Sequence, residues 1–113
     1  MGAMASKEPN SLLHGTLDAL VLKTLEDGPQ HGYAIARGLE TATGGRIDIE
    51  EGSLYPALYR MEKRGWIDAE WGTSELHRRV KLYRLTRAGR AQLARETEAW
   101  ATFSRAVSQV LLA

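Results

Sequence analysis

The apolar positions near the start of the chain recur every three or four residues, which is the spacing of one buried face of a helix. This pattern, carried by Leu17, Leu20 and Val21 among others, predicts a helix from about residue 11 to residue 26. The following residues, 27–29, read Asp-Gly-Pro. They should end the helix, because glycine suits the left-handed cap and proline cannot continue the hydrogen bonding.

A second helix is predicted from about His31 to Thr43, where two glycines end it. Because the connection to the first helix is short, the two helices should pack as neighbours. The expected buried stripe of the second helix consists of Tyr33, Ile35, Ala36 and Leu39.

A third helix is predicted from about Leu54 to Arg64. Ser53 is a favoured N-cap residue, and Pro56 would then lie in the first turn, where its missing N–H costs nothing. The apolar residues of one inward stripe are Leu54, Leu58 and Met61. Two tyrosines, Tyr55 and Tyr59, share a different face with nearby cations, which is an unusual choice for the surface of a short helix.

The next two segments alternate between apolar and polar residues, as strands with one buried face do. Residues 66–71 and 80–85 are expected to form an antiparallel hairpin, joined by a polar link from Gly72 to Arg79. The pattern leaves open which side of the second strand faces the core.

Thr86 is expected to cap a last helix, from about Arg87 to Leu111. The apolar residues of this helix recur at a spacing of seven in two rows, which are Leu93, Trp100 and Val107, and Phe103 and Val110. Apolar side chains at this spacing pack well along a partner helix, so the last helix is expected to join two copies of the chain.

These elements predict a fold that is mainly α-helical with a small β-hairpin, namely a winged helix-turn-helix followed by a C-terminal dimerisation helix. Residues 1–10 are expected to be a disordered or vector-derived N-terminus. Residues 11–90 should form the DNA-binding domain and residues 91–113 the dimerisation helix. In such a fold, the third helix enters the major groove and the hairpin touches the flanking backbone.

Charge is segregated along the chain, although the net charge is only +1. Residues 1–51 hold four basic and eight acidic groups, whereas residues 52–90 hold nine basic and four acidic groups. Clustered positive charge attracts a polyanion such as DNA. A solvated charged surface is the alternative, and charge alone does not decide between the two.

Composition argues against several other classes of protein. The chain has 113 residues, no cysteine, no apolar run long enough for a membrane span and no recognisable signal peptide, so we expect one small cytoplasmic domain without a membrane partner. His14, His31 and His77 are separated in sequence and lack carboxylates at ligand spacing, which argues against a metal site. No catalytic set of acid, base and nucleophile is present, and we expect neither enzymatic activity nor a cofactor.

Four blocks of sequence, in this order, resemble the PadR family of bacterial transcriptional regulators. They are residues 12–17 (LLHGTL), 31–36 (HGYAIA), 52–67 (GSLYPALYRMEKRGWI) and 83–90 (YRLTRAGR). The resemblance covers about residues 12–112 and is to the short subfamily, which has a single C-terminal helix. It implies a homodimer that binds double-stranded DNA at an inverted repeat, represses promoters and is released by a small molecule or a stress signal.

Tyr55 matches the family's recognition-helix tyrosine and is expected to reach base edges or phosphates, unless it packs under the helix. Ser53 is expected to bind a phosphate, with simple capping as the alternative. The other expected DNA contacts are Tyr33, Tyr59, Arg60 and Lys63 on the helices, and Arg78, Arg79 and Lys81 at the hairpin. A core position for Tyr33, a solvated Lys63 and an ordinary solvated hairpin tip remain alternatives.

The expected dimer contacts are Leu13, Leu17, Leu93, Trp100, Phe103, Val107 and Val110. Some short relatives hold planar ligands between tryptophans of their last helices. The resemblance therefore implies that a small aromatic or hydrophobic effector could contact Trp100, with Leu17 and Leu20 as cover. The alternative function is a winged helix that serves protein–protein interaction or dimerisation without binding DNA.

Overall fold

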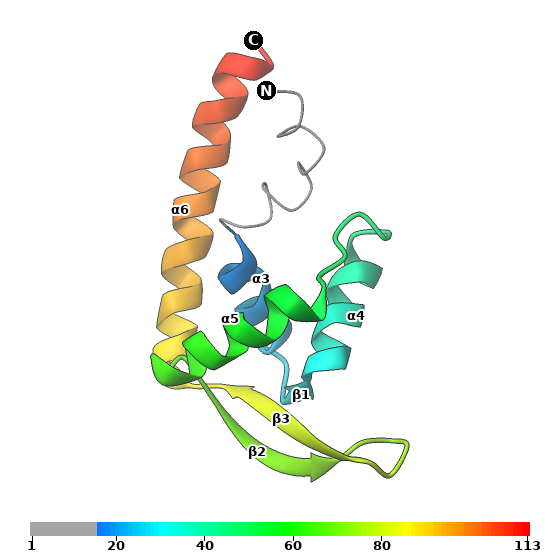
Figure 1. Ribbon diagram of the computed structural model, residues 1–113. Coiled ribbons are helices and arrows are strands. Elements are labelled where there is room, and N and C mark those ends of the chain that lie inside the picture. Colours follow the sequence, from blue (N-terminus) through cyan, green and yellow to red (C-terminus); the bar gives the residue numbers. More distant parts are fainter. Residues whose placement is uncertain (1–15) are drawn as a thin grey trace.

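The computed structural model describes residues 16–113 (Figure 1). Its elements, in chain order, are α3 (Leu17–Thr24), β1 (Gln30–His31), α4 (Gly32–Ala42), α5 (Glu51–Lys63), β2 (Ile67–Thr73), β3 (Arg79–Leu85) and α6 (Arg87–Leu111). The predicted architecture, mainly helical with a small hairpin and a long last helix, is confirmed. The expected N-terminal residues 1–10, the start of the first helix and the dimer contact Leu13 lie outside the described residues.

The three strands form one antiparallel sheet in the order β1–β3–β2. Strand β1 was not predicted, because a two-residue strand is too short to show alternation; its Gln30 pairs with Tyr83 of β3. The β2–β3 register runs from Ile67 opposite Leu85 outward to the hairpin tip. Tyr83 and Leu85 are buried and Arg84 is exposed, which establishes the side of β3 that faces the core.

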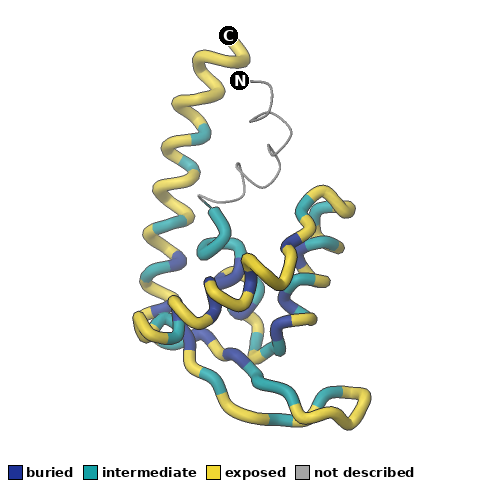
Figure 2. The backbone as a smooth tube through the Cα atoms, in the orientation of Figure 1, coloured by how far each residue is buried: buried dark blue, intermediate teal, exposed yellow. Residues whose placement is uncertain are grey.

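One hydrophobic core joins the helices to the base of the hairpin. Its buried residues are Val21, Leu22, Leu25, Ile35, Leu39, Ile49, Leu54, Ala57, Leu58, Met61, Ile67, Tyr83, Leu85 and Leu93. The predicted inward stripe of the third helix is therefore confirmed. In Figure 2 the buried positions gather where the helices meet, while the hairpin tip and the far part of α6 are mostly exposed.

Helix α5 starts earlier than predicted. Its N-cap is Glu50 and its first residue is Glu51, so Ser53 lies inside the first turn rather than at the cap, and Pro56 lies one turn further in. The acidic Glu51 suits the positive end of the helix dipole, which explains why the helix extends across this segment. The proline removes the N–H that would bond the Gly52 carbonyl, but Gly52 is exposed and solvent can satisfy that group.

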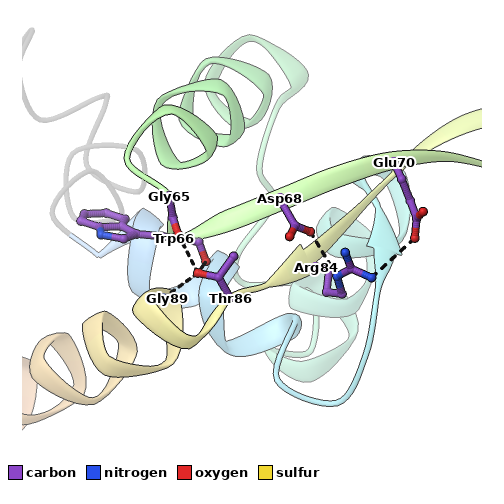
Figure 3. Close-up of polar contacts among 7 residues, drawn as sticks. All are labelled: Gly65, Trp66, Asp68, Glu70, Arg84, Thr86 and Gly89. Atoms are coloured by element: carbon purple, nitrogen blue, oxygen red, sulfur yellow. Dashed lines mark hydrogen bonds and ion pairs between the residues drawn. The ribbon is translucent and has the colours of Figure 1, made fainter.

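Thr86 caps α6 as predicted, and it also ties the helix to the end of α5. Its hydroxyl accepts the Gly89 N–H at 3.0 Å and lies within donating distance of the carbonyls of Gly65, at 2.6 Å, and Trp66, at 3.0 Å (Figure 3). Beyond this junction α6 extends away from the sheet (Figure 1), which places its C-terminal end far from the hairpin.

Candidate nucleic-acid interface

Two tyrosines lie on the outer face of α5, as the sequence indicated. Tyr55 is 43% exposed and Tyr59 is 64% exposed, while Leu54 and Leu58 on the inner face are buried. Because one face of α5 fills the core, its outer face is available to a partner. An aromatic ring with a hydroxyl group can stack or donate a hydrogen bond, and both properties suit contacts to nucleic acid.

Tyr55 lies against the start of α4 as well as toward solvent. A Cβ atom added to Gly32 would come within 2.6 Å of the Tyr55 hydroxyl oxygen. Only a glycine lets α4 approach the ring so closely, so Gly32 fixes where the tyrosine sits relative to α4. The orientation of Tyr55 is therefore set by packing between α4 and α5.

Tyr33 is in the first turn of α4 and is 63% exposed. The prediction that it belongs to the buried stripe of this helix is wrong. Ile35 and Leu39 fill the core from this helix instead, while the Tyr33 ring is stacked beside His31 with their centroids 6.4 Å apart. Its exposure at the N-terminal end of α4 is compatible with the expected phosphate contact.

The cations of α5 have different partners. Lys63 lies over the Tyr59 ring, with its ammonium nitrogen 5.3 Å from the ring centroid. Arg60 instead reaches across to α3 and forms an ion pair with Asp18. Lys63 therefore keeps its charge beside an exposed aromatic ring, whereas a carboxylate already offsets the charge of Arg60.

The hairpin supplies the remaining expected contacts. Arg78 is in the exposed tip, where its backbone N–H donates a hydrogen bond to the Ser74 hydroxyl oxygen at 3.2 Å. Arg79 begins β3, and Lys81 follows on the same side of the strand, where its ammonium nitrogen is 3.3 Å from a carboxylate oxygen of Glu62 on α5. The contact between Lys81 and Glu62 places this side of the hairpin next to α5.

The opposite side of the hairpin is neutralised. The Arg84 side chain is 3.1 Å from a carboxylate oxygen of Asp68 and 3.6 Å from one of Glu70 (Figure 3). The hydrogen bond and the charge of Asp68, together with the charge of Glu70, raise the pKa of the Arg84 guanidinium above its ordinary value. This side of the hairpin offers little net positive charge to a polyanion.

A recess of about 440 Å³ lies between α4 and the N-terminal end of α5. Its lining includes Arg37 and the carboxylates of Glu40, Asp48, Glu50 and Glu51. Because the carboxylates outnumber the single guanidinium, the recess is a poor site for a phosphate. The cationic surface is instead the outer face of α5 together with the α5 side of the hairpin.

The C-terminal part of α6 carries the apolar residues expected at a dimer contact. Trp100 is 52% exposed and Phe103 63% exposed, and both line a recess of about 200 Å³ with Ala19 of α3. Leu20 does not line this recess. Leu93 is buried in the core of its own chain and so lies apart from the exposed residues with which it was grouped.

Comparison with known proteins identifies the chain's family. The sequence profile of the transcriptional regulator PadR-like family matches residues 21–95. The chain belongs to this family. The PadR-like chain is similar to the solved structure of a transcriptional regulator from Clostridium thermocellum, with 28% identity, a TM-score of 0.82 and coverage of 89% of this chain and 98% of that one.

Two further relatives match most of the chain. A PadR family transcriptional regulator from Eggerthella lenta is 31% identical, with a TM-score of 0.81 and coverage of 97% of this chain and 94% of that one. An uncharacterized protein X of Lysinibacillus sphaericus is 29% identical over 92 residues, which is 81% of this chain and 84% of that protein. The resemblance seen in the sequence and the winged-helix fold that it implied are thus confirmed for the PadR-like chain.

Other kinds of site find little support in the described part of the PadR-like chain. Within residues 16–113, no three His, Cys, Asp or Glu side chains are grouped so that they could hold a metal ion. His14, considered in the sequence, lies outside this range. None of the helices that the structure describes is long and apolar enough to cross a membrane.

Sequence reasoning missed one aromatic residue of the PadR-like hairpin. Trp71 of β2 is 60% exposed, and the Arg79 guanidinium lies over its ring. The strand pattern placed Trp71 in a strand, but the contact depends on the register between β2 and β3. That register could not be read from the sequence, because the long link between the strands leaves it open.

Proposed function

We propose that this PadR-like transcriptional regulator acts by binding double-stranded DNA as a homodimer. The observation that carries the proposal is the shared location of exposed tyrosines and cations on the outer face of α5 and on the adjoining side of the hairpin. In a winged helix these are the parts that enter the major groove and contact the flanking backbone. The opposite side of the hairpin, where carboxylates offset Arg84, provides an internal contrast.

The C-terminal part of α6 would form the dimer interface. Trp100, Phe103 and Val110 are all more than half exposed on one chain, and Val107 is 36% exposed. A second copy of the same helix can bury these side chains at heptad spacing. Leu17, which packs partly buried against the core, is expected to contribute from α3.

The dimer would bind an inverted repeat, because two-fold symmetric subunits read two-fold symmetric half-sites. The two α5 helices would enter successive major grooves about 34 Å apart, one turn of the duplex. Tyr55 and Tyr59 would make base or phosphate contacts, with Ser53, Lys63 and Tyr33 at phosphates. Binding of the dimer over a promoter would repress transcription.

A small aromatic or hydrophobic effector would bind in the recess beside Trp100 and Phe103. It would release DNA only if it binds the DNA-free arrangement of the two subunits more tightly than the DNA-bound arrangement. Tryptophan fluorescence titration with planar aromatic compounds tests this part, with Trp100→Leu as the variant. Quenching that is unchanged in Trp100→Leu would contradict an effector at this recess.

The main test is a mobility-shift assay with the DNA directly upstream of the gene, compared with a mixed-sequence duplex at two salt concentrations. Tyr55→Ala should weaken binding to the upstream DNA by roughly tenfold or more, because base contacts and aligned hydrogen bonds are lost. Arg79→Ala should weaken binding to both duplexes and lower the salt dependence by about one phosphate contact per subunit. Arg84→Ala is the matched control and should change little.

A wild-type protein that binds neither duplex would contradict DNA binding and favour the alternative, a winged helix used for protein–protein interaction. Equal affinity for the two duplexes would contradict sequence-specific regulation from this upstream region. Either result would leave the fold and the family unchanged.

A further inference from the structure

The hairpin holds one cation by an aromatic ring rather than by a carboxylate. The guanidinium carbon of Arg79 lies 4.5 Å from the centroid of the Trp71 ring. This is the shortest of the four cation–π distances among the described residues, which otherwise range from 5.2 to 5.7 Å. The two side chains therefore form the tightest cation–aromatic contact in the described part of the chain.

The strand register places this pair on a definite side of the hairpin. Trp71 is opposite Lys81, and Thr73 is opposite Arg79, so Trp71 and Arg79 are diagonal neighbours on one face. Lys81, on the same face, reaches Glu62 of α5 at 3.3 Å. The Trp71–Arg79 pair therefore lies on the side of the hairpin that adjoins α5.

Arg79 has no carboxylate partner among the described residues, unlike the other cations of the strand. Glu62 offsets Lys81, and Asp68 and Glu70 offset Arg84. No ion pair between residues of the described range includes Arg79. An aromatic ring can hold a guanidinium by its flat face and leave the N–H groups at its edge available to another acceptor.

We propose that Trp71 is a positioning residue for DNA binding, which holds the Arg79 guanidinium on the α5 side of the hairpin without neutralising it. This inference rests on the proposed function. A long arginine side chain loses rotamer freedom when it binds a phosphate, and a side chain that is already held loses less. Trp71 thus raises affinity through Arg79, whose N–H groups meet the phosphates beside the groove that α5 enters.

A double-mutant cycle with Trp71→Leu and Arg79→Ala tests the inference. Binding is measured by fluorescence anisotropy on the duplex from directly upstream of the gene and on a mixed-sequence duplex. Trp71→Leu should weaken binding by roughly three- to tenfold per bound subunit when Arg79 is present. The same change should cost less than about twofold in the Arg79→Ala background, because the two residues act as one unit.

Salt dependence and a conservative variant separate positioning from direct contact. Trp71→Leu should leave the slope of log affinity against log salt unchanged, whereas Arg79→Ala should lower its magnitude by about 0.9 per subunit, or about 1.8 for the dimer. Trp71→Phe keeps an aromatic face and should recover part of the affinity. In the free protein, the NMR resonance of the Arg79 Nε–H should lose its ring-current shift in Trp71→Leu but keep part of it in Trp71→Phe.

Each outcome either supports the inference or overturns it. Equal losses from Trp71→Leu with and without Arg79 would mean that the indole contacts DNA by itself, and would overturn the positioning role. Wild-type affinity in Trp71→Leu would overturn it too. A wild-type protein that binds neither duplex would instead contradict the proposed function. Trp71 and Arg79 are exposed, so the variants should keep the wild-type melting temperature, and an equal value would exclude unfolding as the cause of their weaker binding.

Discussion

The two ends of α6 follow the same apolar spacing but have different environments. Near its start, Gly89 and Leu93 are buried against the hairpin and the helices of the same chain. Further along, Trp100 and Phe103 are 52% and 63% exposed, and Val110 is 77% exposed. One continuous helix therefore contributes to the core at one end and presents an apolar surface at the other.

This difference shows that a heptad row does not by itself identify a dimer contact. Leu93, Trp100 and Val107 form one row with a spacing of seven, yet Leu93 is only 6% exposed within its own chain. The hairpin and the short helices cover only the first part of α6, because the helix is longer than the domain on which it packs (Figure 1). The proposed partner helix would cover the rest.

The largest effect is expected at the buried end, from Gly89→Ala. A Cβ atom at this position would overlap the carbonyl oxygen of Trp66, so the junction between the hairpin and α6 would have to open. We expect a loss of about 3 kcal/mol or more in the free energy of unfolding, measured by chemical denaturation.

Gly38→Ala in α4 is the matched control for Gly89→Ala. An added Cβ there meets no atom within 4 Å, and the position is exposed within a helix. This substitution should stabilise the protein by up to about 1 kcal/mol, since alanine favours the helix more than glycine does. If the two substitutions changed the free energy of unfolding equally, the close packing of the start of α6 would be contradicted.

The next largest effect is expected at the exposed end, from Phe103→Glu. In the proposed contact between two copies of α6, the new carboxylate would either be buried at a high cost in free energy or force the two helices apart. We expect dimerisation to weaken by roughly a hundredfold or more, since both subunits carry the change and an aromatic anchor is lost from each. Analytical ultracentrifugation measures this, while circular dichroism should show an unchanged helix content.

Ala94→Glu is the control for this substitution. It adds the same charge to the same helix, but Ala94 is exposed and lies nine residues earlier, on the opposite side of α6. Its dimerisation should stay close to wild type. If Ala94→Glu separates the subunits as strongly as Phe103→Glu does, the exposed apolar residues are not the contact.

The elements themselves were largely predictable, because each depends on local sequence. Thr86 and the period of the following residues predicted α6 with the bounds that the structure has. The start of α5 was not predictable in the same way. Ser53 is a better cap than Glu50 by preference alone, but the helix begins before it, with the acidic Glu51 at the positive end of the helix dipole.

The candidate interface was predictable as a set of residue types, but not as a set of contacts. The exposed face of α5 followed from periodicity, since its apolar residues fixed the inward stripe. The pairing of Arg60 with Asp18 and of Arg79 with Trp71 depends on how separate elements pack. Tyr33 was misjudged for a related reason, because Ile35 and Leu39 already fill the core beneath α4.

The smallest effect is expected from Thr86→Ala, at the junction from which both parts of α6 extend. The substitution removes the hydroxyl that accepts the Gly89 N–H and lies within donating distance of the Gly65 carbonyl (Figure 3). We expect a loss of about 1–2 kcal/mol in the free energy of unfolding, the usual cost of losing a cap. Thr86→Ser keeps the hydroxyl and should recover most of it.

Dimerisation should not change in Thr86→Ala, because the cap is far along the helix from Phe103 and Val110. The same sample can therefore be measured by denaturation and by ultracentrifugation. The free energy of unfolding should fall, while the dimerisation affinity should not change. A loss in both would mean that the start of α6 sets the position of its exposed end. The two parts of the helix would then act as one rigid element rather than as two separate surfaces.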